Sequence, residues 1–540
     1  MNRKYVGITI GPIVKTLMLT TTPAGLWGAS YIFSYFTKKL VEALSTEFVS
    51  DEHFLVPAQN DEVREIVEKC PWAGLYHDRI IFEVSDENEN KIRTCIEKAK
   101  KDLSGAFYNE LIKETCSEKY EEEQVRTYIE NYIQAYAVIM DVEEWENPII
   151  KLGLPLDVLE LQQSYIPKEK NNFILKFLEN RGSLQGAKDL NRNFKIKNSF
   201  LLKNSFENRW HFFDNNSDNI VTIDYIVGAN QTQSKTNAQR KKYYALVKVD
   251  GDNLGRVLKQ MQKDMINTRI RDFSTKCFEY AKEAFEEVEL FGGKMIYAGG
   301  DDLLFISPVI NLNNEKESIF DLLSRLEKIF SKCFEDFSFK SNGEEKKMGF
   351  SAGVMICYYK YPLCEALTGV LDQLNKSKNV KLKNVKLKNS ISIYFEKHSG
   401  KQRALQFKDF TNNCIFTSVL DLLSQYSKSD IQEDFLRSVG RKLEMYQTIF
   451  IEALNRNNDN DFDYLHKVVD NLFEEYPGIF DDGYVNASKE AEYIRKVIFI
   501  LEQLFIINTQ DEREDTSTKS IEELETIIAL LSFYNEKEVE

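Results

Sequence analysis

The sequence predicts an α+β protein of several domains, in which a ferredoxin-like unit occurs twice and mainly helical segments accompany it. The first observation is an order of strand, helix, strand, strand and helix that recurs some 240 residues later. The second is a final strand after the later copy, which completes the split βαβ arrangement. The third is the length of 540 residues, enough for roughly three or four domains.

Four segments follow from this pattern. We expect a first ferredoxin-like domain over 1–105, a helical middle domain with a linker over 106–240, a second ferredoxin-like domain over 241–400, and an acidic helical domain over 401–540. In the first copy, apolar runs predict strands at 4–10, 53–57 and 79–84, and helical spacing predicts helices at about 30–48 and 88–103. The long connection 58–76 separates the second and third strands.

In the second copy, apolar runs and helical spacing predict the same order of elements more clearly. It has a strand at 243–249, a helical stretch to about 290, a hairpin at 294–307, a helix at 318–337 and a strand at 349–358. Before it, residues 105–235 begin as mainly helical, and the polar stretch 228–240 predicts a linker. The tandem repeat of Val-Lys-Leu-Lys-Asn over 380–389 predicts a basic surface hairpin or loop. Helices are expected at 420–426, 433–456, 464–475, 487–508 and 521–534.

Composition narrows the class of protein. No apolar run reaches the ~18 residues of a membrane span, and the N-terminus has no signal-peptide pattern, so we expect a cytoplasmic protein. The eight cysteines form no CxxC pair, which argues against a zinc ribbon. The net charge is −15, and residues 401–540 hold 15 Lys+Arg against 28 Asp+Glu. The acidic tail should therefore pack on partner proteins rather than on RNA.

The hairpin carries Gly299-Gly300-Asp301-Asp302 at its tip, where a turn needs only one polar residue. In the predicted fold, the first strand of the unit lies beside the hairpin, so Asp250 at its end should face Asp301. Carboxylates that converge from two elements suit two Mg²⁺ or Mn²⁺ ions and phosphoryl transfer. We therefore predict Asp250, Asp301 and Asp302 as catalytic residues and, with Gly251, as the metal site.

Neighbouring residues are candidates for binding the nucleotide. Gly251 and Gly255 leave room for a triphosphate at the start of the next helix. Asp252 is either a ligand or the helix N-cap. Lys376 and Lys378 either meet phosphates or are solvated. The predicted nucleotide-binding residues are Asp252, Asn253, Gly255, Gly299, Gly300, Lys376 and Lys378.

These motifs resemble the palm domain shared by nucleotidyl cyclases and certain polymerases. More closely, the chain resembles the large subunit of type III-B CRISPR (Cmr) effector complexes. Further similar stretches are Ile8-Thr9-Ile10-Gly11-Pro12, Leu26-Trp27-Gly28-Ala29-Ser30-Tyr31, residues 359–367 and residues 392–400. The resemblance covers about 1–105 and 240–400. It implies that both ferredoxin-like units are palm domains, of which the second is catalytic.

The chain departs from the family in three ways. It begins directly at the first palm, and His77-Asp78 is a lone pair, so we expect no HD nuclease domain. The family's zinc-binding cysteines are missing. The stretch 13–25 contains no Arg, unlike the Arg-rich helix of many members, so the pocket of the first palm is expected to hold something other than a second ATP.

The resemblance implies a nucleotidyltransferase activated by target RNA, which uses ATP and two metal ions. Its product is either a cyclic oligoadenylate or AMP joined to S-adenosylmethionine, and the departures favour the latter. A candidate acceptor pocket comprises Ser30, Ser34 and Asp78, although Asp78 may equally pair with Arg79 or another neighbour. Implied partners are other Cmr-type subunits, crRNA and target RNA. The alternatives are a catalytically silent scaffold subunit and a free-standing nucleotide cyclase acting on GTP.

Overall fold

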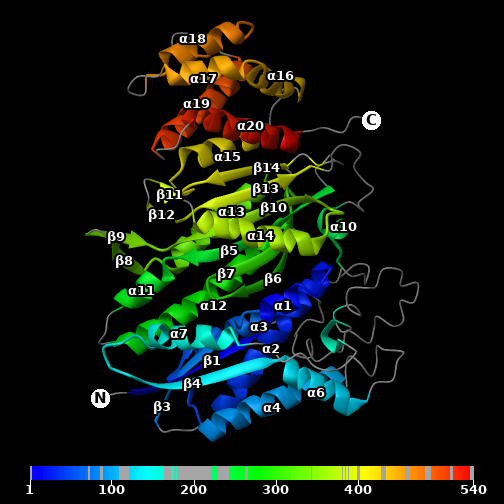
Figure 1. The fold of residues 1–540 in the computed structure, drawn as a ribbon, viewed down its shortest axis with the longest axis vertical. Helices are drawn as coiled ribbons and strands as arrows, with labels where there is room; N and C mark the ends of the chain where they lie inside the picture. Colours follow the sequence, from blue (N-terminus) through cyan, green and yellow to red (C-terminus); the bar gives the residue numbers. More distant parts are fainter. Residues whose placement is uncertain are drawn as a thin grey trace.

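The structure is a computed structural model of the chain. It describes residues 3–70, 73–85, 89–108, 121–162, 172–175, 178, 221–228, 242–261, 265–314, 317–341, 343–379, 381–382, 385–386, 388–397, 400, 402–410, 412–426, 433–456, 461–480, 488–510 and 515–535. Two mixed α/β units and a cap of helices follow one another along the long axis of the molecule (Figure 1). The predicted α+β multidomain fold is confirmed.

The second palm contains the sheet that carries the predicted site. Its core strands are β5 (Tyr243–Asp252), β6 (Lys294–Gly299), β7 (Asp302–Pro308) and β10 (Gly349–Tyr358). The sheet order is β14-β13-β10-β5-β7-β6, so β5 lies between β10 and the hairpin. Strand β13 (Ile391–Glu396) runs parallel to β10, and β14 (Gln402–Phe407) forms the edge. The two edge strands extend the ferredoxin-like core.

Helices cover both faces of this sheet. They are α11 (Leu254–Gln260), α12 (Ile266–Phe291), α13 (Ile319–Cys333) and α14 (Leu363–Lys378). The stretch before 290, expected as one helical run, is therefore two helices. Helix α12 ends where Gly292 adopts a φ of +95°, a conformation that glycine accepts readily. Small hairpins β8–β9 (Ser338–Ser341, Glu344–Lys347) and β11–β12 (Lys381–Leu382, Val385–Lys386) project from this unit. The second of them is the predicted basic hairpin.

The first palm repeats the core topology. Strands β1 (Arg3–Gly11), β2 (Phe54–Val56), β3 (Arg79–Val84) and β4 (Gln134–Val142) form a sheet of order β2-β3-β1-β4. Its helices are α1 (Ile13–Leu17), α2 (Pro23–Glu47), α3 (Asp61–Lys69), α4 (Glu89–Phe107), α6 (Glu122–Tyr132) and α7 (Pro148–Glu160), with a 3₁₀ turn η1 (Asp51–His53).

Two predictions for this region are wrong. The segment after residue 105, expected to be mainly helical, contributes β4, which pairs with the whole of β1 and supplies the sixth element of the ferredoxin-like unit. Helix α2 begins at Pro23 rather than near residue 30, because Thr22 caps it by accepting a hydrogen bond from the Gly25 N–H at 3.1 Å. Of the predicted linker, only Gly228 lies within the described residues, after the short helix α10 (Ile223–Ile226).

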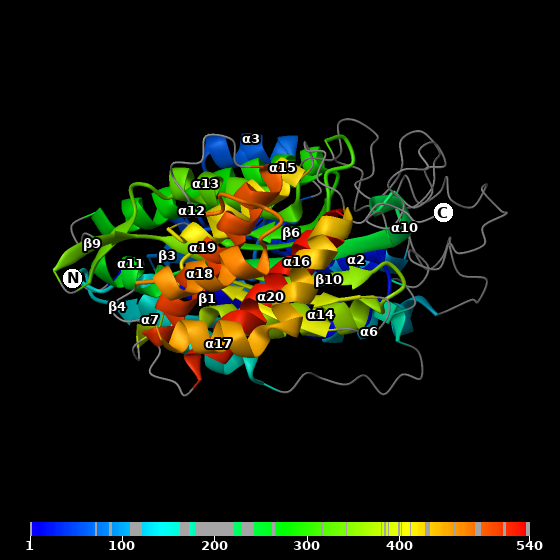
Figure 2. The ribbon, with the colours of Figure 1, turned by 90° about the horizontal axis from the view of Figure 1, so that it is seen from above.

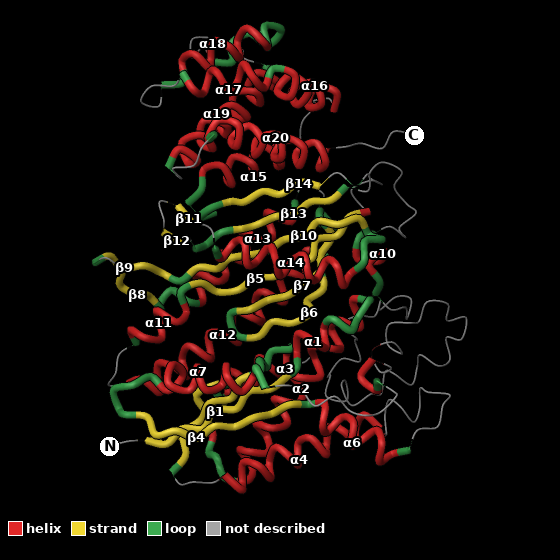
Figure 3. Tube along the Cα trace, in the orientation of Figure 1, coloured by secondary structure: helices red, strands yellow, loops and turns green. Residues whose placement is uncertain are grey.

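Helices pack between the two sheets and join the palms. Figure 3 shows α2, α3 and α12 between the two layers of strands, and α12 contacts both β2 and α3. The Ala58 N–H donates to the Ser274 hydroxyl at 3.0 Å in a buried position. The Ala298 N–H of the β6–β7 hairpin donates to the Ala73 carbonyl at 3.1 Å. The hairpin is thus fixed by the first palm as well as by its own sheet.

The C-terminal helices cover the far edge of the second palm. They are α15 (Cys414–Tyr426), α16 (Glu433–Met445), α17 (Gln447–Asn455), α18 (Asp463–Leu472), α19 (Lys489–Thr509) and α20 (Thr516–Asn535). The single helix expected over 433–456 is therefore two. Seen from above in Figure 2, these helices lie over the rest of the molecule. Helix α20 packs on β14, and the Tyr534 hydroxyl donates to the Val309 carbonyl at 3.3 Å. None of the helices among the described residues is long and apolar enough to cross a lipid bilayer.

Candidate active site

The site begins with the turn between β6 and β7. Strand β6 ends at Gly299 and β7 begins at Asp302, which places Gly300 and Asp301 at the tip. Gly300 has a φ of +68°, in the left-handed region that favours glycine. A Cβ on Gly299 would lie 3.4 Å from the Cβ of His77, so the hairpin tip lies directly against the first palm. The predicted hairpin is confirmed.

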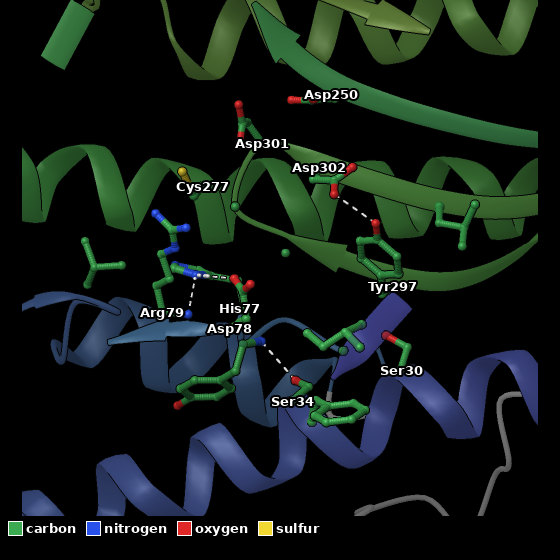
Figure 4. Close-up of a pocket in the computed structure, with 18 of the residues that line it drawn as sticks. Ser30, Ser34, His77, Asp78, Arg79, Asp250, Cys277, Tyr297, Asp301 and Asp302 are labelled. Carbon is green, nitrogen blue, oxygen red and sulfur yellow. Dashed lines mark hydrogen bonds and ion pairs between the residues drawn. The ribbon is translucent and has the colours of Figure 1, made fainter. Parts of the chain in front are cut away.

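Asp250 and Asp301 meet at one end of the sheet. Strand β5 pairs with β7 up to Val249 and Leu303, so the residues that follow Val249 lie beside the hairpin tip. A Cβ on Gly251 would lie 2.3 Å from Asp301 Oδ2. Only glycine therefore allows the Asp301 carboxylate to approach the β5 backbone. Figure 4 shows Asp250 on its strand and Asp301 on the hairpin turn, both above the first palm.

Burial and neighbouring negative charge raise the pKa of both hairpin aspartates. Burial and then the negative charges of Asp250 and Asp302 raise the pKa of Asp301 to about 7. Burial also raises the pKa of Asp302 to about 6, with Asp250 adding to the rise and Lys248 opposing it. A cluster of acids that resists full ionisation is stabilised by a nearby cation.

A lysine side chain pairs with one carboxylate of this cluster. Lys378, the last residue of α14, donates to Asp250 Oδ2 and, at 3.3 Å, to the Gly251 carbonyl. This places Lys378 at the site, as predicted. Lys376 instead pairs with Asp372 at 2.7 Å on an exposed helix face and does not line the cavity described below. Of the two predicted outcomes for Lys376, the structure therefore shows the solvated one.

Asp252 has a different environment from the one expected. It is 1% exposed and accepts hydrogen bonds from the Ser351 hydroxyl at 2.5 Å and the Asn389 N–H at 2.7 Å. Lys388 Nζ lies 3.4 Å from its other oxygen. The N-cap of α11 is Asn253, with a φ of +67°, so the prediction of Asp252 as the cap is wrong. Because β5 continues through Asp252, its carboxylate ties β5 to β10 and to the segment before β13.

Among the described residues, no group of three or more His, Cys, Asp or Glu side chains is arranged as a ready metal centre. The donor chemistry nevertheless fits a divalent cation. Two carboxylates with raised pKa and the Gly251 carbonyl lie together, and the buried Asp302 Oδ1 has no hydrogen-bond partner. Asp250, Asp301 and Asp302 would hold the ion, in place of the present lysine contact to Asp250.

A cavity of about 560 Å³ opens in front of the carboxylates, between the two palms. Its second-palm wall includes Asp250, Gly299, Gly300, Asp301 and Asp302. Its first-palm wall includes Ser30, Ser34 and Asp78, the residues predicted for an acceptor pocket. All of these residues, which come from widely separated parts of the chain, therefore line one cavity.

The first-palm wall is ordered by its own contacts (Figure 4). The Ser34 hydroxyl accepts a hydrogen bond from the Tyr76 N–H at 3.0 Å. Arg79 does not pair with Asp78, because its guanidinium binds Asp157 at 2.5 Å and Glu160 at 2.8 Å. Burial tends to raise the pKa of Asp78, but the hydrogen bond and charge of His77 outweigh it and the pKa is lowered. Asp78 therefore presents a negative charge to the cavity.

Two family models match the chain. The model of the Cas10/Cmr2 second palm domain matches residues 243–388, and that of the CRISPR-associated protein Cmr2 N-terminal region matches residues 5–133. The chain belongs to the Cas10/Cmr2 family. The match to the second palm domain includes Asp250 and the hairpin carboxylates, and the match to the N-terminal region includes Ser30, Ser34 and Asp78.

Individual Cas10/Cmr2 relatives agree with this assignment. The chain is 32% identical over 182 residues to the CRISPR system Cmr subunit Cmr2 of Pyrococcus furiosus, covering 29% of this chain and 19% of that protein. It therefore spans about a fifth of that relative's length. A type III-B Cmr-beta structure bound to cognate target RNA superposes with a TM-score of 0.58 at 12% identity, covering 98% of this chain and 83% of that chain. A Csm1–Csm4 cassette in complex with cA4 gives 0.52 at 11% identity, covering 99% and 70%. Both show the shared fold.

Sequence reasoning missed two residues of this Cas10/Cmr2-type site. Lys248 and Tyr297 line the cavity and contact Asp302. The signal was present, because Lys248 is the one charged residue in the apolar run 243–249 of this strand. A charge within a buried strand requires a partner, and the hairpin beside it supplies one.

Proposed function

We propose that this chain is the nucleotidyltransferase subunit of an RNA-guided type III CRISPR complex, using ATP to make a signalling nucleotide. The observation that carries the proposal is the convergence of Asp250, Asp301 and Asp302 on one wall of a cavity built by both palms. Family membership supports the same reaction class. A silent scaffold would have no need for three mutually repelling, partly buried carboxylates at one point.

The proposed reaction joins an adenylyl group to a ribose hydroxyl. The acceptor 3′-oxygen forms a bond to the α-phosphorus of ATP, the bond from that phosphorus to the bridging β-phosphate oxygen breaks, and pyrophosphate leaves with the hydroxyl proton passing to solvent. A divalent cation held by Asp250 and Asp301 would neutralise charge on the reacting phosphate and lower the pKa of the hydroxyl. Lys378 moves from Asp250 toward the phosphates, and Gly251 keeps the backbone close to Asp301.

We further propose that the acceptor is S-adenosylmethionine. The first-palm wall carries the Asp78 carboxylate, and Arg79, which lines the same wall, is already bound to Asp157 and Glu160. A second triphosphate at this wall would meet a negative charge without a free guanidinium. The sulfonium and amino groups of S-adenosylmethionine are cations and complement Asp78. Ser30 and Ser34 would orient the acceptor's ribose or amino acid part.

Oligoadenylate synthesis is the second candidate. A Csm1–Csm4 cassette of the same fold has been solved in complex with cA4, and this precedent supports the second candidate. The type III-B Cmr-beta structure bound to cognate target RNA supports an assembly role for the present chain. We propose other Cmr-type subunits, crRNA and target RNA as its partners, with the acidic C-terminal helices contacting protein.

Product analysis tests this proposal. The assembled complex is incubated with target RNA, Mg²⁺ or Mn²⁺, labelled ATP and S-adenosylmethionine, and products are identified by mass spectrometry. We expect a product that contains both AMP and the methionine moiety. An Asp301→Ala/Asp302→Ala variant should make none, whereas Asp372→Asn, which removes an exposed carboxylate paired with Lys376, should match the wild type.

The outcomes separate the hypotheses. A product built from adenylates alone would favour oligoadenylate synthesis over the S-adenosylmethionine reaction. An assembled complex that binds target RNA but makes no nucleotide product would favour the scaffold. Activity of the isolated chain with GTP, independent of RNA, would favour a free-standing cyclase.

A further inference from the structure

Lys248 is a charged side chain in the middle of the catalytic sheet. It is 7% exposed, and its neighbours in β5, Val247 and Val249, are fully buried. A buried ammonium is unfavourable unless it is paired and hydrogen-bonded. Burial at this position favours an apolar residue. The contacts that Lys248 makes explain why a charged side chain stands there instead.

Lys248 belongs to a closed network of three side chains. Its Nζ donates to Asp302 Oδ2 and to the Tyr297 hydroxyl. The Tyr297 hydroxyl donates to the same Asp302 oxygen at 2.8 Å (Figure 4). Lys248 Nζ also lies 4.4 Å from the centre of the Tyr297 ring, within reach of a cation–π interaction. Both donors thus converge on one oxygen of Asp302.

The two adjacent carboxylates of the hairpin consequently differ. Asp302 is held through Oδ2, while its Oδ1 is buried and without a hydrogen-bond partner. Asp301 instead approaches the Gly251 backbone, next to Asp250. A carboxylate fixed at one oxygen can present the other in only one direction.

We propose that Lys248 and Tyr297 are positioning residues that hold Asp302 by Oδ2 and direct Oδ1 to the reacting groups, whereas Asp250 and Asp301 form the principal cation pair. This inference rests on the proposed nucleotidyl transfer. Without Lys248, Asp302 loses this ion pair and its carboxylate rotates away. Turnover then falls more than ATP binding, because Asp250, Asp301 and Lys378 still bind the nucleotide.

Kinetics of the assembled complex test the positioning role. For Lys248→Met we expect kcat to fall about 100-fold while KM for ATP changes less than about 3-fold. Lys248→Arg should recover about a tenth or more of the lost rate, and Tyr297→Phe should reduce kcat about 10-fold. Lys294→Met is the matched control, because Lys294 pairs with Glu289 at 2.6 Å at the opposite end of the same hairpin. It should stay within about 2-fold of the wild type.

A cycle of variants supplies a readout that does not depend on turnover. We measure the melting temperature and Mn²⁺ affinity of the wild type, Lys248→Met, Asp302→Asn and the double variant. Lys248→Met should lower the melting temperature by several degrees, and adding Asp302→Asn should restore most of it, because the unpaired charge is removed. Mn²⁺ affinity should change less than about 3-fold in Lys248→Met, since the principal cation pair is intact.

The possible failures can be told apart. Additive melting shifts, or a Lys248→Met complex within about 2-fold of wild-type kcat, would overturn the assignment of Lys248. Equal losses in Lys248→Met and Lys294→Met would also overturn it. A wild-type complex that makes no product would contradict the proposed function, and the coupling of Lys248 to Asp302 would still be measured by the melting cycle.

Discussion

The two palms share one topology but present different chemistry to the cavity between them. In each, the first strand lies between the third and fourth strands of the unit, as β1 does in β2-β3-β1-β4 and β5 does in β10-β5-β7-β6. In the second palm the middle strands are joined by the tight turn of Gly299 to Asp302, which places carboxylates at the sheet end. In the first palm the equivalent connection is long and contains α3. The two palms therefore differ in this connection, which brings two carboxylates to the sheet end in the second palm only.

The strongest test of this division is to remove a carboxylate from the second palm. Asp250→Asn or Asp301→Asn should lower nucleotidyl transfer by about 10³-fold or more, because charge on the reacting phosphate is no longer neutralised. Initial rates of labelled product formation measure the effect. Residual activity near the wild-type level would place the reaction outside this palm.

The next largest effect should come from the glycine that admits Asp301. In Gly251→Ala the new Cβ would meet Asp301 Oδ2 at 2.3 Å and force this carboxylate to move, and we expect a rate loss of about 10²-fold. Gly255→Ala is the matched control, since a Cβ there meets nothing within 4 Å. Equal rates for the two variants would show that the approach of Asp301 to β5 is not needed.

A smaller effect is expected in the first palm. Asp78→Asn removes the charge that faces the acceptor, so KM for S-adenosylmethionine should rise about 10-fold while KM for ATP stays the same. Steady-state kinetics with each substrate varied in turn will show this. Asp141→Asn, on the exposed strand β4, serves as the control. A rise in KM for ATP alone would reverse the assignment of the two walls.

The carboxylate cluster should also make stability depend on pH. Because the folded-state pKa of Asp301 is about 7 and its ordinary value is 3.8, the folded protein binds this proton more tightly than the unfolded chain. The free energy of unfolding therefore falls as pH rises from about 4 to 7 and levels off above it. In metal-free buffer, Asp301→Asn should melt about 2–4 °C higher than the wild type at pH 8, a gain that shrinks toward pH 5. Scanning calorimetry across this range measures it, and a parallel profile for both proteins would contradict the origin of the raised pKa.

The smallest predicted effect concerns the contact between the palms. Ser274→Ala removes the hydroxyl that accepts from the Ala58 N–H and leaves a buried donor unpaired. We expect a loss of about 1–2 kcal/mol in the free energy of unfolding. Chemical denaturation provides the value. Thr268→Ala, on the same helix α12, is the comparison, and equal losses in both variants would argue against a specific contact between the palms.

Much of this comparison could be predicted from the sequence. The spacing of strands placed Asp250 beside Asp301, and the short helix face carrying Ser30 and Ser34 was assigned to the opposite wall. The structure places Asp250 beside Asp301 because strand pairing in the ferredoxin-like unit determines which strand ends meet. The role of Ser30 and Ser34 in binding an acceptor stays a prediction. Strand β4 could not be predicted from the sequence. It lies at the edge of its sheet, so most of its residues are only half-buried and its apolar pattern is weak.

The contacts that depend on tertiary packing could not be predicted from the sequence either. Asp252 and Asp250 are two residues apart in one motif, yet Asp252 binds Ser351 and Asn389, which lie 99 and 137 residues away. Lys376 and Lys378 look equivalent on a helix end, yet only Lys378 reaches β5. Such differences depend on how α14 and the strand ends pack, which local spacing does not encode.

The central claim is that only the second palm accepts a nucleoside triphosphate. Equilibrium dialysis of the assembled complex with target RNA, Mg²⁺ and a labelled, non-transferable ATP analogue measures it directly. The account predicts one analogue bound per chain, with binding strongly weakened in an Asp250→Asn/Asp301→Asn variant and unchanged in Asp78→Asn. Two analogues bound per chain, one of them still bound in the Asp250→Asn/Asp301→Asn variant, would contradict it.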